Sequence, residues 1–597
     1  MRPLILIVLL AGVSLFALLG HTRAVDTSSA KFDGPAELPR IYLQTSLADT
    51  PAPGKIRTVK AGDNLQSALD QAACGDTLSL EAGAIFTGHF VFPKKNCNDA
   101  HWIILRTSTP DSDLPAEGSR LTPCYAGVSS LPGRPDFHCT STKNVLAKLV
   151  FAGKSGAGPI IFAAGANHYR LECLEVTRAE NENSISALIM PEVHAPADHI
   201  VLDRDWVHGT AQGETTRGIF LTGMAFTAIV DSYFSDFHCI SVTGSCTDAQ
   251  AIGGGGGDQP SGPYKIVNNF LEASGENILF GGGPATVTPA DIEIRRNHFF
   301  KPLIWKPGES GFVGGTSGKP FIVKNLFELK NAQRVLFDGN LLDNSWGGVG
   351  QMGFALVLTP RNQNSQCPLC RVTDITLRNS IIRHMGSGMS IANAPADTGG
   401  IAAAGERYSI HDLIFEDIDA DAYKGFGAFA MIISNGPQLR DVKIDHITAL
   451  PSRVALIIGA DRDKPLPSNF LITNSILSAG EREVTSTGGG QKNCAFGVVQ
   501  MGPEAIFRSC FQQMTFDHNA IIGSSKQWPK GNSFPKNEDS IGFVSANHGK
   551  DDEYRLCAEK NKSPNCKKAS SYLRAASDGK NVGADADVVD AATADVE

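Results

Sequence analysis

Apolar residues alternate with polar ones in short stretches along most of the chain, and many stretches end at an asparagine or aspartate followed by another apolar residue. Because successive side chains of a strand point to opposite faces, this alternation predicts strands. The unit returns at intervals of roughly 15 to 45 residues, which predicts a solenoid built from one strand–bend–strand unit. The predicted polar anchors are Asp205, Asp231, Asn269, Asn297, Asn325, Asn340, Asn379, Asp417, His446, Asn474 and Asn519.

Asparagine suits the bend because it tolerates left-handed backbone angles and forms local hydrogen bonds. The uneven spacing is expected, since insertions in a solenoid collect in loops on one face, which is often the binding face. A β-sandwich or a propeller is the alternative. We disfavour it because Asn-Gly hairpin signals are nearly absent.

Two terminal segments add a family resemblance to this periodicity. The run from Val59 to Asp70, followed by Cys74-Gly75-Asp76-Thr77-Leu78, is similar to the first coil of many right-handed parallel β-helices of the pectate-lyase-like superfamily. The stretch from Tyr572 to Asp585 is similar to their last part. The resemblance implies an all-β, right-handed parallel β-helix solenoid with a short N-terminal capping helix. It does not select a reaction, because the scaffold carries lyases, hydrolases, epimerases and adhesins.

The ends of the chain divide it into four predicted parts. Met1-Arg2-Pro3 and the apolar run from Leu4 to Leu19 predict a signal peptide over residues 1–24, with small residues at the cleavage position. An uncleaved anchor is the alternative. Residues 25–57 are then an N-terminal extension, 58–585 one β-helix domain and 586–597 an acidic tail. One domain is expected because a solenoid needs no second core. The export signal predicts a secreted, periplasmic or cell-surface protein, and we expect a monomer.

Thirteen cysteines behind an export signal indicate an oxidising compartment. Proximity in the sequence suggests six disulfides and leaves Cys173 single. A redox or metal role for the Cys367-Pro-Leu-Cys370 motif is the alternative to a loop clip. The suggested pairs are Cys74–Cys97, Cys124–Cys139, Cys239–Cys246, Cys367–Cys370, Cys494–Cys510 and Cys557–Cys566.

Charge points to the ligand class. The formal net charge of −9 argues against a nucleic-acid partner. Within residues 295–334, however, basic side chains are opposed only by Glu309 and Glu328, which predicts a groove for an acidic polysaccharide. Scattered solvated lysines are the alternative, and Trp305 and Trp346 are expected either to face sugar rings or to pack inside. The basic residues are Arg295, Arg296, Lys301, Lys306, Lys319, Lys324, Lys330 and Arg334.

The same window resembles β-helical lyases that cleave alginate or chondroitin-type chains. A lysine followed by an arginine one coil later implies Lys330 as base and Arg361 as acid. The resemblance also implies Ca²⁺ held by Glu328 with Asn297 or Asn325. Neighbouring cations are expected to lower the pKa of the Lys330 ammonium. His298 is a second candidate base, and His238 a third.

These observations predict a polysaccharide lyase that cleaves a uronate-containing polymer by β-elimination. One alternative is a non-catalytic carbohydrate-binding or cell-surface β-helix. A second is a glycoside hydrolase, which needs converging carboxylates that the sequence does not clearly supply. The loop from Asp248 to the glycine run 253–257 is a candidate cleft wall. No phosphate-binding loop is present in the sequence.

Overall fold

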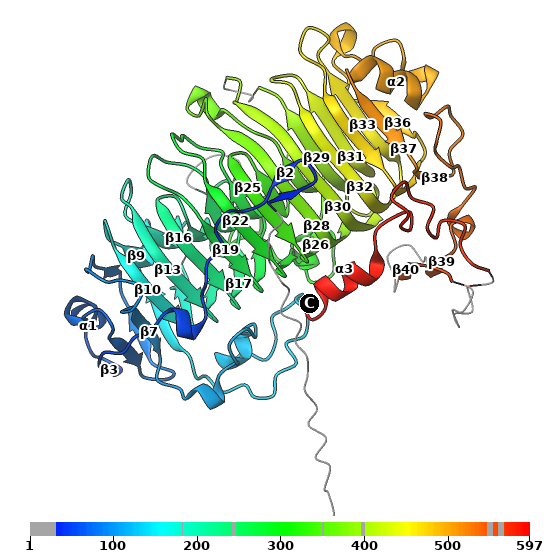
Figure 1. Cartoon of the computed structure of the whole chain (residues 1–597). Coiled ribbons are helices and arrows are strands. Elements are labelled where there is room, and N and C mark those ends of the chain that lie inside the picture. The colour runs from blue at the N-terminus through cyan, green and yellow to red at the C-terminus, as the bar shows by residue number, and fades with distance from the viewer. Residues whose placement is uncertain are drawn as a thin grey trace, which may run out of the picture.

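The computed structural model describes residues 31–181, 183–241, 246–348, 351–395, 400–545, 553–558, 566 and 568–597. The predicted signal peptide lies outside these residues. No helix in the described part of the chain is long and apolar enough to cross a membrane. Figure 1 shows a long stack of coils with α1 at one end and α2 at the other. The helices are α1 (Leu65–Gln71), α2 (Pro503–Cys510) and α3 (Ala586–Thr593).

Two long sheets of parallel strands form the walls of the stack, so the predicted right-handed parallel β-helix is confirmed. A typical coil gives two short strands to a 24-stranded sheet and one strand to a 12-stranded sheet. The 12-stranded sheet consists of β6 (Phe90–Phe92), β9 (Ala157–Phe162), β12 (Ala187–Pro191), β15 (Arg217–Phe220), β18 (Gln250–Gly254), β21 (Glu276–Phe280), β24 (Phe327–Leu329), β27 (Phe354–Leu358), β29 (Ser387–Asn393), β31 (Ala428–Ser434), β33 (Val454–Ala460) and β36 (Val484–Ser486).

The 24-stranded sheet begins near the N-terminus and ends at residue 522. In β28, β30 and β32 the two short strands of a coil have merged into one long strand. The sheet consists of β3 (Ile56–Val59), β4 (Thr77–Leu80), β5 (Ile85–Thr87), β7 (Ile103–Thr107), β8 (Ala147–Phe151), β10 (Asn167–Glu172), β11 (Leu174–Arg178), β13 (Ala197–Asp203), β14 (Trp206–His208), β16 (Met224–Val230), β17 (Tyr233–Phe237), β19 (Tyr264–Val267), β20 (Phe270–Ala273), β22 (Ala290–Arg295), β23 (His298–Phe300), β25 (Ala332–Asp338), β26 (Leu341–Ser345), β28 (Arg371–Met385), β30 (Ala404–Ile418), β32 (Arg440–Pro451), β34 (Ser468–Thr473), β35 (Ile476–Ser478), β37 (Met514–Asp517) and β38 (Ala520–Ile522).

The alternating apolar residues of the repeated motif form the core between the sheets. Ile294 is paired with Ile266 on one side and with Phe337 on the other, and all three are buried. The same row continues through equivalent apolar residues to Phe516. Each residue therefore buries its side chain against its counterparts one coil away, which is the main stabilising contact of a solenoid.

The polar anchors of the motif form a ladder inside the bend that follows each first strand. The amide side chain of Asn297 accepts hydrogen bonds from the backbone N–H and the side chain of Asn269, at 2.9 Å each. It donates to the carbonyl of Ile266 at 2.9 Å and to the Asn340 side chain at 3.1 Å. Asn340 in turn accepts from the Asn297 backbone at 2.9 Å. Buried backbone groups that the bend leaves without a strand partner are satisfied in this way.

Some predicted anchors are one residue earlier in the sequence than the residue that takes part in the ladder. Asp231, Asn379 and Asn474 have φ angles of 54°, 50° and 53°, so they supply the left-handed residue of the bend. The following serine, for example Ser380, bonds to the preceding coil instead, with the Asn340 backbone N–H donating to its hydroxyl at 3.0 Å. The motif therefore contains two polar positions, and the sequence pattern had merged them.

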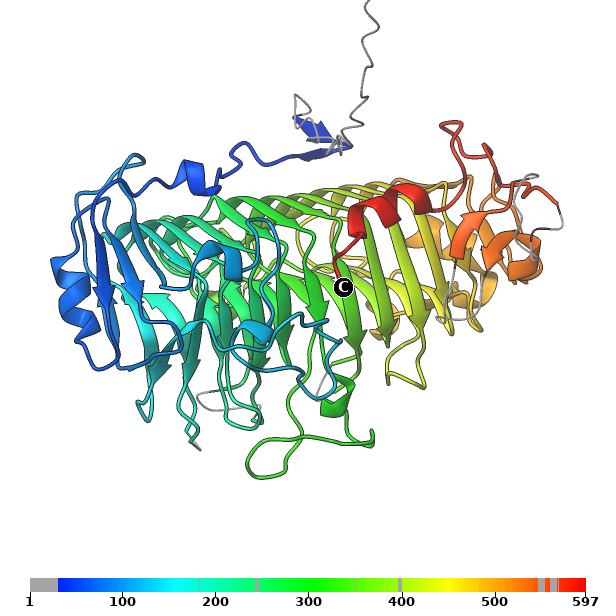
Figure 2. The ribbon, with the colours of Figure 1, turned by 90° about the horizontal axis from the view of Figure 1, so that it is seen from below.

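An N-terminal strap, residues 31–50, crosses the outer face of the 24-stranded sheet (Figure 2). Asp33 accepts from Arg378 at 2.8 Å and lies 3.1 Å from Nε2 of His411. Further along, the carbonyl of Thr45 accepts from Arg170 at 2.9 Å. At the other end of the chain, the predicted acidic tail contains α3, which packs against β28 and β30 (Figure 2).

The strap should loosen at high pH. Burial opposes protonation of His411, but hydrogen bonds to Asp33 and Asp412 raise its pKa to about 9. A raised pKa contributes stability that is complete below the ordinary histidine value of 6.5 and is lost as the pH rises through about 9. The Asp33 pKa is lowered, so its own contribution is lost only in acid. We expect the protection of backbone amides near Asp33, taken as the exchange rate relative to an unstructured chain at the same pH, to fall between pH 6.5 and pH 10, and an Asp33→Asn variant to lose most of this fall.

All six suggested disulfides are confirmed, and Cys173 is free and buried. The Cys367–Cys370 motif is a loop clip with a Cα–Cα distance of 5.3 Å. Six disulfides fit an extracellular protein, because a reducing cytosol would not maintain them.

Candidate active site

Five charged residues meet on the middle coils of the 12-stranded sheet, and we call them the acid–lysine cluster. Three consecutive coils supply them. Asp248 precedes β18 and Glu276 opens β21, while the other three lie in or beside β24. The members are Asp248, Glu276, Lys324, Glu328 and Lys330.

The two lysines link the three carboxylates. Lys324 forms an ion pair with Asp248, and its Nζ lies 3.6 Å from Oε1 of Glu276. Nζ of Lys330 lies 3.3 Å from Oε1 of Glu328. The other oxygen of Glu328 accepts a hydrogen bond from the side chain of Asn325 at 3.0 Å. The structure thus brings together three residues of the sequence prediction, namely Lys330, Glu328 and Asn325.

Glu276 is the least satisfied member of the cluster. Its side chain is fully buried, and neither carboxylate oxygen has a hydrogen-bond partner among the described residues. Burial raises its pKa, the Lys324 charge opposes this, and the neighbouring Glu328 raises it further. Burial likewise raises the pKa of Asp248, with Glu276 adding to the effect. A buried carboxylate without donors is costly, which suits either a shared proton or a bound cation.

The prediction for the pKa of Lys330 was in the wrong direction. Burial does lower it, but Glu328, Glu276 and Asp248 outweigh burial, and the resulting pKa is raised. The expected crowding by cations fails partly because Arg334 is engaged in the other sheet, where it pairs with Asp291 at 2.7 Å. Lys330 is therefore held as an ammonium group by its carboxylate neighbours.

Glycines form the surface beside Lys330. A Cβ atom added to Gly282 would lie 3.5 Å from Nζ of Lys330, and one added to Gly281 would lie 2.8 Å from its Cβ. On the preceding coil, Gly255 would meet the backbone of Gly281 at 2.4 Å. The 253–257 run thus lies next to the cluster. A cavity of about 260 Å³ opens beside it, lined in part by Phe220, Gly256, Gly257 and Gly283.

Arg361 lies one coil beyond Lys330, as the sequence overlay predicted. Its backbone N–H donates to the carbonyl of Lys330 at 3.1 Å. Its guanidinium group, however, donates to the carbonyl of Pro395 at 2.6 Å and is part of an exposed contact. The backbone is positioned as expected, whereas the side chain is engaged elsewhere.

Asn297 and His298 lie away from the acid–lysine cluster. All four polar contacts of the Asn297 side chain belong to the ladder, which leaves no oxygen for a metal. His298 is fully buried in β23 of the 24-stranded sheet, with Nε2 at 2.7 Å from Asp343. Burial lowers its pKa, although Asp343 opposes the effect. His238 packs against Phe321, with the ring centroids 3.9 Å apart.

Most of the basic window is engaged in internal contacts. Arg295 lies 3.3 Å from Glu293, Arg296 donates to the carbonyls of Ala592 and Ala594, and Lys306 pairs with Glu309 at 2.5 Å. Lys301 is fully buried, and its Nζ donates to the carbonyls of Ala273 and Gly275. The structure therefore divides the window between two sheets and does not gather it into one positive groove.

Trp305 and Trp346 are 1% and 2% exposed and pack together with Phe321 and Val323. These neighbours cover the ring faces, so the two tryptophans pack inside the protein, which is the second of the two arrangements expected from the sequence.

A cavity of about 720 Å³ lies outside the acid–lysine cluster. Residues of the N-terminal strap, the 117–138 loop and the C-terminus enclose it over the 24-stranded sheet, and His298 is in its wall. Its basic groups are engaged, since Arg170 pairs with Asp203 at 2.5 Å and Arg120 donates to the carbonyl of Val596 at 2.8 Å. We therefore place the candidate chemistry at the smaller, glycine-lined surface.

Sequence reasoning missed Glu276 and gave Asp248 no chemical role. A signal for Glu276 existed, because a charged residue opens the apolar strand one coil before Glu328. This signal could not be recognised without knowing how the two coils align, because Glu276 and Glu328 are 52 positions apart in the sequence and an irregular loop lies between them.

Neither a protein-family model nor a curated protein matches the sequence. Among solved structures, the chain is similar to a PL6 family polysaccharide lyase from Pseudopedobacter saltans, with 11% identity and a TM-score of 0.41 over 78% of this chain and 92% of the other. It is also similar to a pectate lyase (10%, 0.34, covering 90% and 97%) and to the catalytic domain of an α-1,3-glucanase (10%, 0.34, covering 83% and 70%). These likenesses concern the fold. By its fold and its site, the protein is a parallel β-helix with an acid–lysine cluster on its 12-stranded sheet.

Proposed function

We propose that this protein is an exported carbohydrate-active enzyme that cleaves a uronate-containing polysaccharide by β-elimination. The observation that supports this most directly is the meeting of Lys330, Glu328, Glu276 and Asn325 beside a surface of glycines. A surface of glycines lets an extended polymer approach the backbone closely. Ionisable groups with shifted pKa values, here Glu276, Asp248 and Lys330, are typical of functional sites.

In the proposed reaction Lys330 first loses its own proton, once a cation engages its carboxylate neighbours, and its neutral amine then removes the proton at C5 of the uronate. The electron pair forms the C4–C5 double bond, and the C4–O glycosidic bond breaks. The leaving oxygen receives a proton from Arg361, whose guanidinium group must first leave Pro395. Arginine is a weak acid, so its positive charge also stabilises the developing oxyanion.

The donor set fits Ca²⁺, which prefers carboxylate and amide oxygens. Glu276, Glu328 and Asn325 would hold the ion, and the oxygens of Glu276, which have an ion-pair contact with Lys324 but no hydrogen bond, are the clearest sign of a place for it. When bound, Ca²⁺ would offset the substrate carboxylate and engage the glutamates that hold Lys330 protonated. Lys324 then remains to pair with Asp248.

The test is incubation of the mature protein with a panel of uronate polysaccharides, in Ca²⁺ or in chelator. We expect ultraviolet absorbance from unsaturated uronate ends in Ca²⁺ and its loss in chelator. Glu276→Gln should raise the Ca²⁺ concentration needed for half-maximal activity by about 10- to 100-fold. Polymer binding without any product would instead identify a non-catalytic carbohydrate-binding β-helix.

A glycoside hydrolase is the second candidate, and one observation favours it. Three carboxylates do converge, and burial raises the pKa of both Glu276 and Asp248, as a general acid requires. New reducing ends without ultraviolet absorbance would support hydrolysis over β-elimination.

A further inference from the structure

A second group of chemistry-bearing side chains lies near the N-terminal end of the solenoid, on the outer face of the 24-stranded sheet. His168 of β10 and His199 of β13 stand on adjacent coils, and their rings are stacked with centroids 4.4 Å apart and an angle of 3°. Oδ1 of Asp99 lies 3.1 Å from Nε2 of His168. One ring nitrogen from each histidine and one Asp99 oxygen lie within 4.8 Å of one another.

The hydrogen bonds around His168 fix which of its nitrogens carries a hydrogen. The side-chain nitrogen of Asn167 donates to two carbonyls, those of Lys95 at 3.1 Å and Gly165 at 3.0 Å. The other side-chain atom of Asn167 must therefore be its oxygen, which can only accept. Because this oxygen lies 2.9 Å from Nδ1 of His168, Nδ1 must be the donor.

His199 is oriented in the same manner. Its Nδ1 lies 2.5 Å from Oδ1 of Asp198, a carboxylate that can only accept. In a neutral ring, Nε2 is then the nitrogen with a free lone pair. Metal-binding histidines typically have this arrangement, with the second ring N–H donated to a carboxylate or a carbonyl oxygen.

With these assignments, two hydrogen-bond acceptors face each other, namely Nε2 of His168 and Oδ1 of Asp99. Nε2 of the neutral His168 ring carries no hydrogen, and the Asp99 carboxylate beside it carries none either. Such a contact needs a cation or an added proton between the two atoms. A proton between His168 and Asp99 would leave the His199 lone pair unused, whereas a metal cation can bind both histidines and Asp99.

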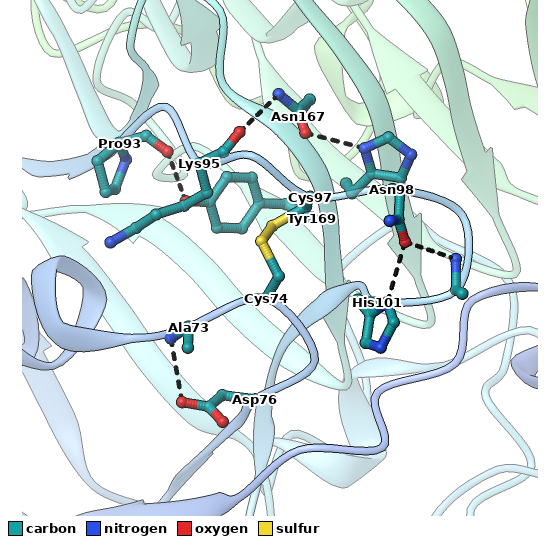
Figure 3. Close-up of a disulfide and its surroundings, with 12 residues drawn as sticks. Ala73, Cys74, Asp76, Pro93, Lys95, Cys97, Asn98, His101, Asn167 and Tyr169 are labelled. Carbon is teal, nitrogen blue, oxygen red and sulfur yellow. Dashed lines mark hydrogen bonds between the residues drawn. A yellow bond between two sulfur atoms is a disulfide. The ribbon is translucent and has the colours of Figure 1, made fainter.

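The surroundings hold these groups in place. The loop with Asp99 is closed by the Cys74–Cys97 disulfide, and Asn98 accepts from the backbone N–H of Ala100 and from His101 (Figure 3). The bond from Asn167 to Lys95 ties the same loop to β10 (Figure 3). The Trp102 ring packs edge-on against His168 at 5.0 Å. Asp99 itself has an 87% exposed side chain, which gives it room to turn towards an ion.

We propose that Asp99, His168 and His199 bind a divalent transition-metal ion, with Zn²⁺ as the best match. Imidazole nitrogens and a carboxylate oxygen are common zinc ligands, and three protein ligands leave a fourth tetrahedral position for water. The ion joins the disulfide-closed loop to two coils of the sheet. This site does not depend on the proposed lyase activity, because none of its residues belongs to the acid–lysine cluster.

Isothermal titration of the chelator-treated full protein with ZnCl₂ tests the site. We expect one saturable site per chain and a higher melting temperature when Zn²⁺ is added. Asp99→Ala, which alters only an exposed side chain, and His199→Ala should each weaken binding by about 100-fold or more, and Asp198→Asn by about 10- to 100-fold. Titration with Co²⁺ should give visible absorbance that is lost in the same variants.

The matched control is His194→Ala. His194 also lies near an aspartate, 3.4 Å from Asp258, but it is exposed, and no histidine among the described residues stacks on it. Binding should be unchanged in this variant. Absence of saturable Zn²⁺ binding to the unaltered protein would overturn the proposal. Binding that survives in both Asp99→Ala and His199→Ala would overturn it as well, because the ion would then be held elsewhere.

Discussion

Lys330→Ala is expected to lower kcat/KM on the responsive uronate polymer by about 1,000-fold, the range for loss of a general base. In our proposal the Nζ of Lys330 receives the C5 proton, and the other lysine of the cluster, Lys324, is paired with Asp248. The rate of ultraviolet absorbance increase, measured at saturating and at limiting substrate, reports the change. Polymer binding should remain within a few-fold of the original, since only one of several contacts is lost.

The control for this experiment is Lys319→Ala. Lys319 belongs to the same basic window but has an exposed side chain, and activity should stay unchanged. Melting temperatures of both variants show whether the fold is intact. Full activity of a folded Lys330→Ala protein would rule out Lys330 as the base and leave Glu276 and Asp248 as the groups to test.

Asn297→Ala is expected to reduce the free energy of unfolding by about 3 to 4 kcal/mol. The substitution removes four buried hydrogen bonds and leaves the Ile266 carbonyl and the Asn269 N–H without partners. Urea unfolding followed by circular dichroism measures the loss. Because Asn297 belongs to the ladder, the loss should be equal in Ca²⁺ and in chelator.

Asn144→Ala is the matched comparison, since Asn144 is exposed in a loop, and its cost should stay within about 0.5 kcal/mol. A destabilisation by Asn297→Ala that disappears in chelator would contradict the ladder assignment and return Asn297 to the predicted calcium ligands.

The fold was largely predictable because the repeated motif is itself the structural unit. The alternation of Ile292 and Ile294 reflects side chains that pack on the same positions one coil away, so local pattern and tertiary contact coincide. The disulfides were predictable for a related reason. Each joins cysteines close in sequence, at separations from 3 residues for Cys367–Cys370 to 23 for Cys74–Cys97.

The candidate site was predictable only where its residues are neighbours in the sequence. Glu328, Lys330 and Asn325 were found in one short window, whereas Glu276 was missed and Asn297 was assigned to the wrong environment. The positive charge of residues 295–334 was also misleading, because the chain turns between the two sheets within this window. Arg296 and Lys301 make contacts elsewhere, whereas Lys324 pairs with Asp248 in the cluster. Counting charges along a chain does not show which sheet they face.

The sequence by itself determined the strand periodicity, the stacking of one unit and the pairing of the cysteines, since these depend on residues at short or regular separation. The tertiary structure alone decided which charges meet. Loops of irregular length set the register between coils, and that register placed Glu276 beside Glu328 and His168 beside His199. It also decided the ionisation of Lys330, because carboxylates from other coils raise the pKa that the local lysines were expected to lower.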